Sequence, residues 1–244
     1  MKKLIYLLVF GQCCGMVSAQ EPLRPVELVK YHKTMGSRNT PKVNLISLKS
    51  ASLRGEPSVQ AEVTEGTLLN FNMSQARAIQ SNPPKFMTMS LPVADGRNLD
   101  VELVWVDIYA PGYLTTTTGP EVEWNAATHY RGIVKGDEHS VAAISIMDGE
   151  VMGMFSTHRD GNIVLGALKD NAARTHILYK DANLVAQNPF ECHTEDDGWG
   201  YTEEELQGTP NIRALSDCIR IYYEADYDIY QDKGSGTQAF IAAE

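Results

Sequence analysis

Cysteine, basic residues and long apolar runs are all scarce in this sequence of 244 residues. Its 4 cysteines are too few for the disulfide framework of a small cysteine-rich domain. Its 21 lysines and arginines stand against 31 aspartates and glutamates, so we expect no nucleic-acid partner for so acidic a chain. No stretch approaches the roughly 18 consecutive apolar residues of a membrane-spanning helix, and we expect no membrane span.

Residues 1–19 have the pattern of a secretory signal peptide. Lys2 and Lys3 supply the positive start, LIYLLVF the apolar centre, and Val17-Ser18-Ala19 the small residues that favour cleavage. We therefore expect a secreted or periplasmic bacterial protein that begins near Gln20.

Residues 20–185 have the pattern of one β-rich domain. Short β-branched and apolar runs alternate with turn signals, and the Asp-Gly pairs at 95–96, 148–149 and 160–161 are typical of tight hairpins. One helix is predicted at 74–80, ahead of Pro83-Pro84. We expect a mainly β, antiparallel fold with strands at 43–48, 67–71, 85–91, 99–109, 140–147, 150–156, 162–168 and 175–180.

The composition changes after Lys180. Residues 186–213 are rich in Asp, Glu, Gly and Pro, and we interpret them as an acidic linker whose charges face solvent. Residues 214–244 contain one strand pattern at 218–224 and end on the helix-forming run TQAFIAAE. Because one strand and a short helix cannot bury a core, we expect 214–244 to be the truncated start of a second domain.

Two segments resemble the precursors of reprolysin (adamalysin-like) zinc metalloproteases. HYRGIVKGDEHSVAAISIMDGEVMGMF at 129–155 is similar to the prodomain signature of that family, and IRIYYEADYDIYQ at 219–231 resembles the first strand of its catalytic domain. The resemblance implies the N-terminal part of a zymogen. Its β-rich propeptide, 20–185, would keep a zinc metalloendopeptidase latent and assist its folding, and an incomplete α/β catalytic domain would start at 214.

The zinc-binding motif of that family, His-Glu-x-x-His-x-x-Gly-x-x-His, is absent from this sequence. We therefore expect no metal ligand and no catalytic residue in this chain, which should be inactive alone. The resemblance assigns the zinc to the missing part of the catalytic domain. That domain would be the partner of the prodomain in cis, and proteins or peptides would be its substrates.

Cys192, in PFECHTED, is the sequence's candidate for a regulatory group. The resemblance implies a cysteine switch, in which the Cys192 thiolate occupies the fourth zinc position in place of water. One alternative is a disulfide with Cys218, which the oxidising environment of a secreted protein allows. The other alternative is an unreactive thiol. Arg213 and Ala214 form a candidate activation cleavage site, since they directly precede the catalytic-like segment.

The remaining polar residues point to structure rather than chemistry. The six histidines are scattered, so we expect surface or packed side chains, and neither Ser140 nor Ser145 has a nucleophile-elbow pattern around it. We expect Trp105 and Trp124 to be core aromatics. The alternative function is a secreted β-sandwich adhesin or carbohydrate-binding module without catalysis. Such a module is expected to end with a completed strand or a polar tail, whereas residues 219–244 end on a helical pattern.

Limited proteolysis tests the predicted boundaries. The first cuts are expected between Ala186 and Ala214, because that stretch lacks the apolar periodicity of packed elements. Mass spectrometry of the early fragments is the measurement. A stretch that resists cleavage as long as the β-rich domain does would contradict the linker.

Overall fold

The computed structural model describes residues 23–35, 40–50, 53, 57–93, 96–109, 113, 115, 127–147, 149–168, 174–185, 225 and 227–243. The chain divides into two units, and all of these residues belong to one of them. The predicted signal peptide and the predicted acidic linker lie outside the described residues, as does the strand predicted at 218–224.

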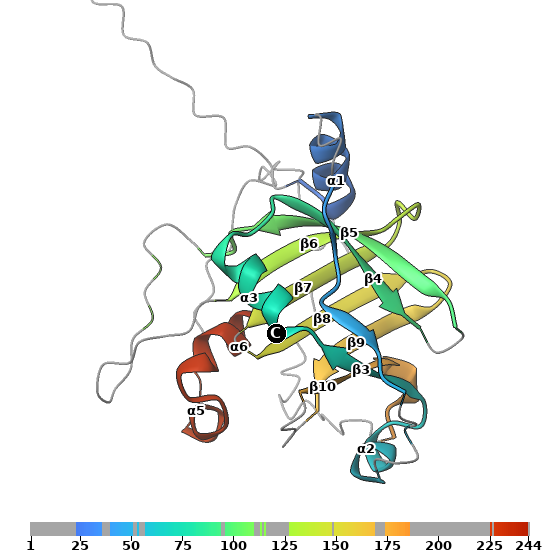
Figure 1. Ribbon diagram of the computed structural model, residues 1–244, viewed down its shortest axis with the longest axis vertical. Coiled ribbons are helices and arrows are strands. Elements are labelled where there is room, and N and C mark those ends of the chain that lie inside the picture. Colours follow the sequence, from blue (N-terminus) through green and yellow to red (C-terminus); the bar gives the residue numbers. More distant parts are fainter. Residues whose placement is uncertain are drawn as a thin grey trace, which may run out of the picture. The chain divides into compact units, whose positions relative to one another are not determined.

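The strands of the described residues form one sheet (Figure 1). They are β1 Lys42–Val43, β2 Ile46–Leu48, β3 Gly66–Phe71, β4 Phe86–Pro92, β5 Asn98–Val106, β6 Thr128–Val134, β7 Val141–Met147, β8 Glu150–Thr157, β9 Gly161–Ala167 and β10 Thr175–Lys180. Their order is β1-β4-β5-β6-β7-β8-β9-β10-β3-β2. The expected mainly β class is confirmed. Neighbouring strands are antiparallel except β1 and β4, which pair in parallel.

The helices of the described residues are short. They are α1 Pro25–Thr34, α2 Pro57–Glu62, α3 Met73–Ser81, η2 Asp181–Asn183, α5 Tyr227–Lys233, η3 Gly234–Gly236 and α6 Thr237–Ala243. None of these helices combines the length and the apolar character needed to cross a membrane. The helix expected at 74–80 is confirmed as α3, where the Asn72 side chain caps the N-terminus by accepting a hydrogen bond from the Gln75 N–H at 3.1 Å.

Three of the expected hairpin turns have the backbone that an Asp-Gly pair favours. Gly96, Gly149 and Gly161 have φ angles of 78°, 94° and 70°. Only glycine adopts these values without steric cost, so the turns follow directly from the sequence.

The single strand expected at 43–48 is wrong. Its first part is β1 at one edge of the sheet, and its last part is β2 at the other edge. The side chain of Leu45, between them, is fully buried, and its carbonyl accepts a hydrogen bond from the Asn72 N–H at 2.8 Å. The run 43–48 has the pattern of one strand because its middle residue, Leu45, enters the core between the two strands. It does not form one long strand.

A second correction concerns the N-terminal segment of the β-rich domain, where the sequence predicts no helix. Residues 25–34 form the helix α1 instead, because Pro25 fits the first turn and the Glu27 carboxylate accepts a hydrogen bond from the Arg24 backbone N–H at 2.9 Å. Val29 of α1 is buried against Phe86, Val104 and Ile133 on the outer face of the sheet. Lys33 adds an ion pair at 2.6 Å with Glu102, whose side chain is 6% exposed.

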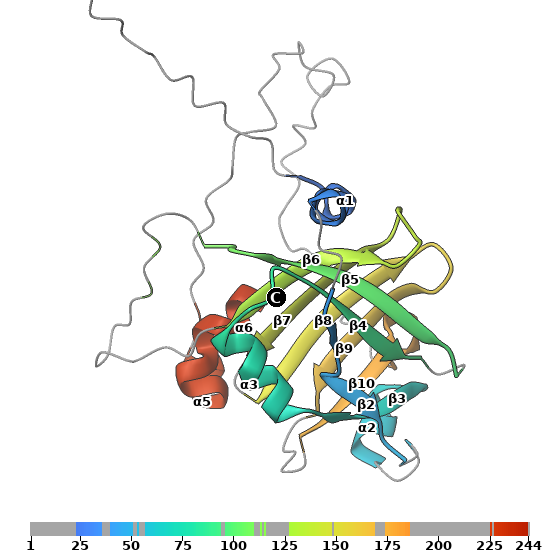
Figure 2. The same ribbon diagram turned by 45° about the horizontal axis from the view of Figure 1, so that its top comes forward.

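The main core lies inside the curl of the sheet (Figure 2). The curl has two ends. At the α3 end, β7 passes into β8, and Ala76 and Ile79 of α3 join the core. At the far end lie the connections at 93–97, 135–140 and 158–160 together with the last residues of β10. α3 therefore packs against the core at one end of the curl.

Gly132 of β6 is required by close packing between strands. A Cβ at this position would lie 1.8 Å from the carbonyl oxygen of Glu102 on the neighbouring strand β5. We expect Gly132→Ala to lower the free energy of unfolding by about 3 kcal/mol, because the backbone must move to remove the clash. Urea unfolding followed by circular dichroism measures the change.

Gly166 of β9 provides the matched control. A Cβ there would meet nothing within 4 Å, so Gly166→Ala should change the free energy of unfolding by less than about 1 kcal/mol. Equal effects of the two substitutions would show that the approach of β5 to β6 is not what selects glycine at 132.

Candidate functional site

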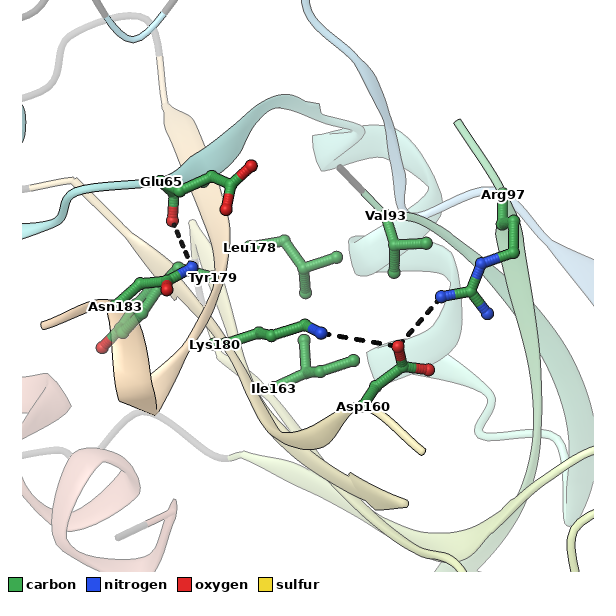
Figure 3. A pocket seen from close by; sticks show the side chains of 10 residues that line it. Glu65, Val93, Arg97, Asp160, Ile163, Leu178, Tyr179, Lys180 and Asn183 are labelled. Carbon is green, nitrogen blue, oxygen red and sulfur yellow. Dashed lines mark hydrogen bonds and ion pairs between the residues drawn. The ribbon is translucent and has the colours of Figure 1, made fainter. Parts of the chain in front are cut away.

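A cavity of about 230 Å³ lies at the far end of the curled sheet (Figure 3). It is bordered by residues from four regions of the chain: the start of β3, the β4–β5 connection, the β8–β9 turn with β9, and the end of β10 with η2. The lining residues are Glu65, Gly66, Val93, Arg97, Asp160, Ile163, Leu178, Tyr179, Lys180 and Asn183. Residues far apart in the sequence therefore meet here.

Asp160 is the central charged group of the cavity. Its side chain is 8% exposed, and its Oδ1 accepts a hydrogen bond from Nη2 of Arg97 at 2.9 Å. Nζ of Lys180 lies 3.5 Å from the same oxygen. A buried carboxylate is costly unless it is paired, so the two cations make its position tenable.

The β8–β9 turn fixes the position of Asp160. Its backbone N–H donates to Oγ1 of the buried Thr157 at 2.9 Å, and Gly161 supplies the left-handed backbone that reverses the chain. The carboxylate is therefore held by its own turn, and Arg97 and Lys180 reach it from two other elements.

The rest of the cavity lining includes both aliphatic and polar side chains. Val93, Ile163 and Leu178 form an aliphatic wall that continues into the main core. Nδ2 of Asn183 donates to the carbonyl of Glu65 at 3.3 Å, and the Glu65 side chain is exposed. The cavity thus combines an aliphatic wall with charged groups of both signs.

A second polar cluster lies on strands β6 and β7. Nδ1 of His129 is 2.9 Å from Oγ of Ser145, its cross-strand neighbour, and Nε2 is 3.5 Å from the hydroxyl of Tyr109. Burial lowers the pKa of His129, and the charge of Arg131 lowers it further. The histidine is nearly fully buried, and its ring is held between a hydroxyl and a phenol rather than by a carboxylate.

The other serine considered from sequence has a purely structural role. The Ser140 hydroxyl donates to the Asp137 carbonyl at 2.6 Å and accepts from the Val134 N–H at 2.8 Å, which holds the β6–β7 turn. His139 beside it is exposed.

His176 is fully buried at the α3 end of the sheet. Its Nε2 accepts from the Val151 N–H at 3.1 Å, its Nδ1 lies 3.0 Å from the Arg174 carbonyl, and its ring stacks on Phe71. Both nitrogens are satisfied by a neutral ring with the proton on Nδ1. Burial lowers the pKa of His176 despite the hydrogen bond to Arg174, so the folded state holds the neutral form.

The site residues predicted from sequence are not brought together in this part of the chain. Cys192, Arg213 and Ala214 lie outside the described residues, and so does Cys218. No group of three or more His, Cys, Asp or Glu side chains in the described segments could hold a metal ion. These segments do not supply the donors of a zinc site.

Comparison with known proteins leaves the family open. No protein-family model matches the sequence, and no solved structure matches the fold.

Sequence reasoning missed the cavity. Asp160 was noticed only as part of a turn, and nothing in the sequence pairs it with Arg97 or Lys180. The expectation of a core position for Trp105 is wrong, because this side chain is 40% exposed, and Trp124 lies outside the described residues.

The buried His176 makes stability depend on pH. The unfolded chain takes up a proton near the usual pKa of 6.5, whereas the folded state resists it, so the contribution of this group is present above pH 6.5 and lost as the pH falls. We expect the free energy of unfolding of His176→Gln to be lower at neutral pH but to vary less between about pH 6.5 and pH 5.

Urea unfolding over this pH range is the measurement, and His158→Gln is the control because His158 is exposed. His158→Gln should keep the pH dependence of the wild type. If the free energy of unfolding of His176→Gln varied with pH as much as that of the wild type, other groups would be responsible for the pH dependence.

Proposed function

We propose that this chain is the N-terminal part of a secreted zinc metalloendopeptidase zymogen. In this proposal the β-rich segment 20–185 is the inhibitory prodomain and assists folding, and residues from 214 onward start the catalytic domain. The family resemblance assigns the zinc and the catalytic groups to the rest of that catalytic domain.

The observation that carries the proposal is the contact between the C-terminal helices and the β-rich sheet. Helix α6 lies against β7, where Thr237 and Ala239 are buried. Nζ of Lys233 lies 3.6 Å from Oε1 of Glu150 at the start of β8, and 4.3 Å above the ring of Phe240. Lys233 thus links α5, α6 and the sheet.

This contact fits a prodomain that assists folding. A helix of one or two turns such as α6 is unstable alone in water, because the cost of nucleation is not recovered in so short a segment. Burial against β7 supplies the missing stabilisation. A prodomain that holds the first helices of the following domain would act in the same way on the complete precursor.

The segment that resembles the family's prodomain signature also has a central place in the fold. Residues 129–155 form β6, β7 and most of β8, which are neighbours in the middle of the sheet. Tyr130, Ile144 and Phe155 from these strands are core residues. Part of the second resembling segment, 227–231, belongs to the helix α5 and not to a strand.

The reading frame after residue 244 gives the first test. About 150 further codons, the usual size of one domain, should encode His-Glu-x-x-His-x-x-Gly-x-x-His. A continuation without this motif would exclude the proposed protease.

Cys192→Ser in the complete precursor tests the mechanism of latency. The proposed thiolate is a much better zinc ligand than a serine hydroxyl, so this variant should hydrolyse peptides before any cleavage of the chain, whereas the wild type should not. The measurement is the initial rate on a quenched fluorescent peptide library.

Cys218→Ser is the control for a disulfide. If Cys192 blocks the zinc, Cys218→Ser keeps the wild-type latency. If the two cysteines form a disulfide, both variants stay latent and lose about 2–4 kcal/mol of stability. That outcome would contradict the switch and leave the prodomain's own contacts to hold the protease inactive.

A further inference from the structure

We propose that the outer face of β7, β8 and β9 is the surface on which the β-rich domain holds the domain that follows α6. This surface, the outer strip, consists of Val141, Ala143, Met152, Met154, Val164 and Gly166. The inference rests on the proposed function, because it names the rest of the catalytic domain as the partner.

The pleat of the strands places the outer strip opposite the core. In β8, the core residues Val151 and Phe155 alternate with residues that point outward. The register of the sheet sets Ala143 beside Met154, and Met154 beside Val164. The outer strip is therefore continuous across three neighbouring strands.

The outer strip is only partly covered. Val141 and Met154 are 45% and 51% exposed, and a Cβ at Gly166 would meet nothing within 4 Å. On either side of the strip the same face is covered, since Val29 of α1 packs against β4, β5 and β6, and Val59 of α2 packs beside β3 and β10. Adjacent exposed apolar residues of this kind mark a contact surface.

The residue types of the outer strip suit a folded partner. Methionine side chains are flexible and polarisable, so Met152 and Met154 can fit an irregular apolar surface. Gly166 lies inside a strand, where a glycine lets another backbone or side chain approach closely. We therefore expect the partner to present apolar side chains to β8 and β9.

The contact with the C-terminal helices leads directly to the outer strip. Nζ of Lys233 lies 3.6 Å from Oε1 of Glu150, at the start of β8. Glu150 is on the same face as Met152 and Met154, because successive side chains of a strand alternate between faces. Helix α6 lies beside β7 near that start (Figures 1 and 2). A domain that continues from α6 therefore begins next to the strip.

The size of the outer strip favours this tethered partner over a second copy of the chain. Three strands about 4.8 Å apart and four residues of about 3.3 Å give a footprint of roughly 200 Å². A stable interface between separate molecules covers roughly 800 Å² on each partner. A domain joined to α6 is held near the strip at an effective concentration on the order of millimolar, so a much smaller contact suffices.

Methionine oxidation measures the proposed contact. The probe is hydrogen peroxide, which converts exposed methionine to its sulfoxide, and mass spectrometry of peptides gives the rate at each position. The 244-residue chain is compared with the product of the complete reading frame. Met154 should react at least about fivefold more slowly in the longer protein, because the following domain covers it. Met35, 70% exposed, should react equally fast in both, and the fully buried Met89 equally slowly.

Met154→Glu tests whether the outer strip itself makes the contact. A carboxylate opposes burial, so in the longer protein Met152 should regain the oxidation rate that it has in the 244-residue chain. Met35→Glu is the matched control, because it makes the same change at an exposed methionine outside the strip, and it should leave Met152 and Met154 protected. Both variants of the 244-residue chain should keep the wild-type Tm within about 2 °C, since both replaced side chains are exposed.

The outcomes separate this inference from the proposed protease. Equal oxidation of Met154 in the two proteins overturns the docking surface and leaves the protease to the search for its zinc motif. Continued protection of Met152 in a folded Met154→Glu overturns it as well. Slow oxidation of Met154 in the 244-residue chain that speeds up on dilution assigns the strip to a second copy, against the proposal. Protection in a longer protein without the zinc motif excludes the protease but keeps the strip as the docking surface, and a reading frame that ends soon after residue 244 overturns both.

Discussion

Two residues, Asn44 and Leu45, join the two edges of the sheet, and the arrangement of the whole domain depends on this short connection. The chain from the end of β1 to the start of β2 spans at most roughly 11 Å. A flat sheet with this strand order would separate the same edges by roughly 43 Å, since neighbouring strands lie about 4.8 Å apart. The sheet must therefore curl until β2 approaches β4, as observed. The buried Leu45 side chain anchors the connection in the core.

The curl turns one face of the sheet into an interior with two ends. Different kinds of side chain lie at the two ends. Apolar side chains of α3 complete the core at one end. The far end contains a carboxylate, two cations and an aliphatic wall. Asp160 tolerates its burial only because Arg97 and Lys180 converge on it. The same convergence ties the β4–β5 connection, the β8–β9 turn and the end of β10 together.

Local signals in the sequence predicted most of the sheet. The alternating apolar runs and the Asp-Gly turns gave most strands from β3 to β10, because both signals act within a few residues. The same reasoning failed at 43–48, where one apolar run serves both edges of a curled sheet, and at 25–34, where helix capping decides the structure. The candidate cavity was not predictable from a single sequence. Arg97, Asp160 and Lys180 meet only because the curl brings three distant connections to one end, and no local pattern encodes that meeting.

The pairing of β3 with β10 has a consequence for how the domain is made. Within the described residues, β3 is one of the first strands and β10 is the last, and Nζ of Lys49 donates to Oγ1 of Thr175, 126 positions later. Contacts so distant in sequence slow folding, since a long loop must close before they form. During synthesis, β3 has no strand for one of its two sides until β10 has emerged. The apolar stretch 66–71 is therefore exposed to wrong partners while the roughly one hundred residues up to β10 are being made.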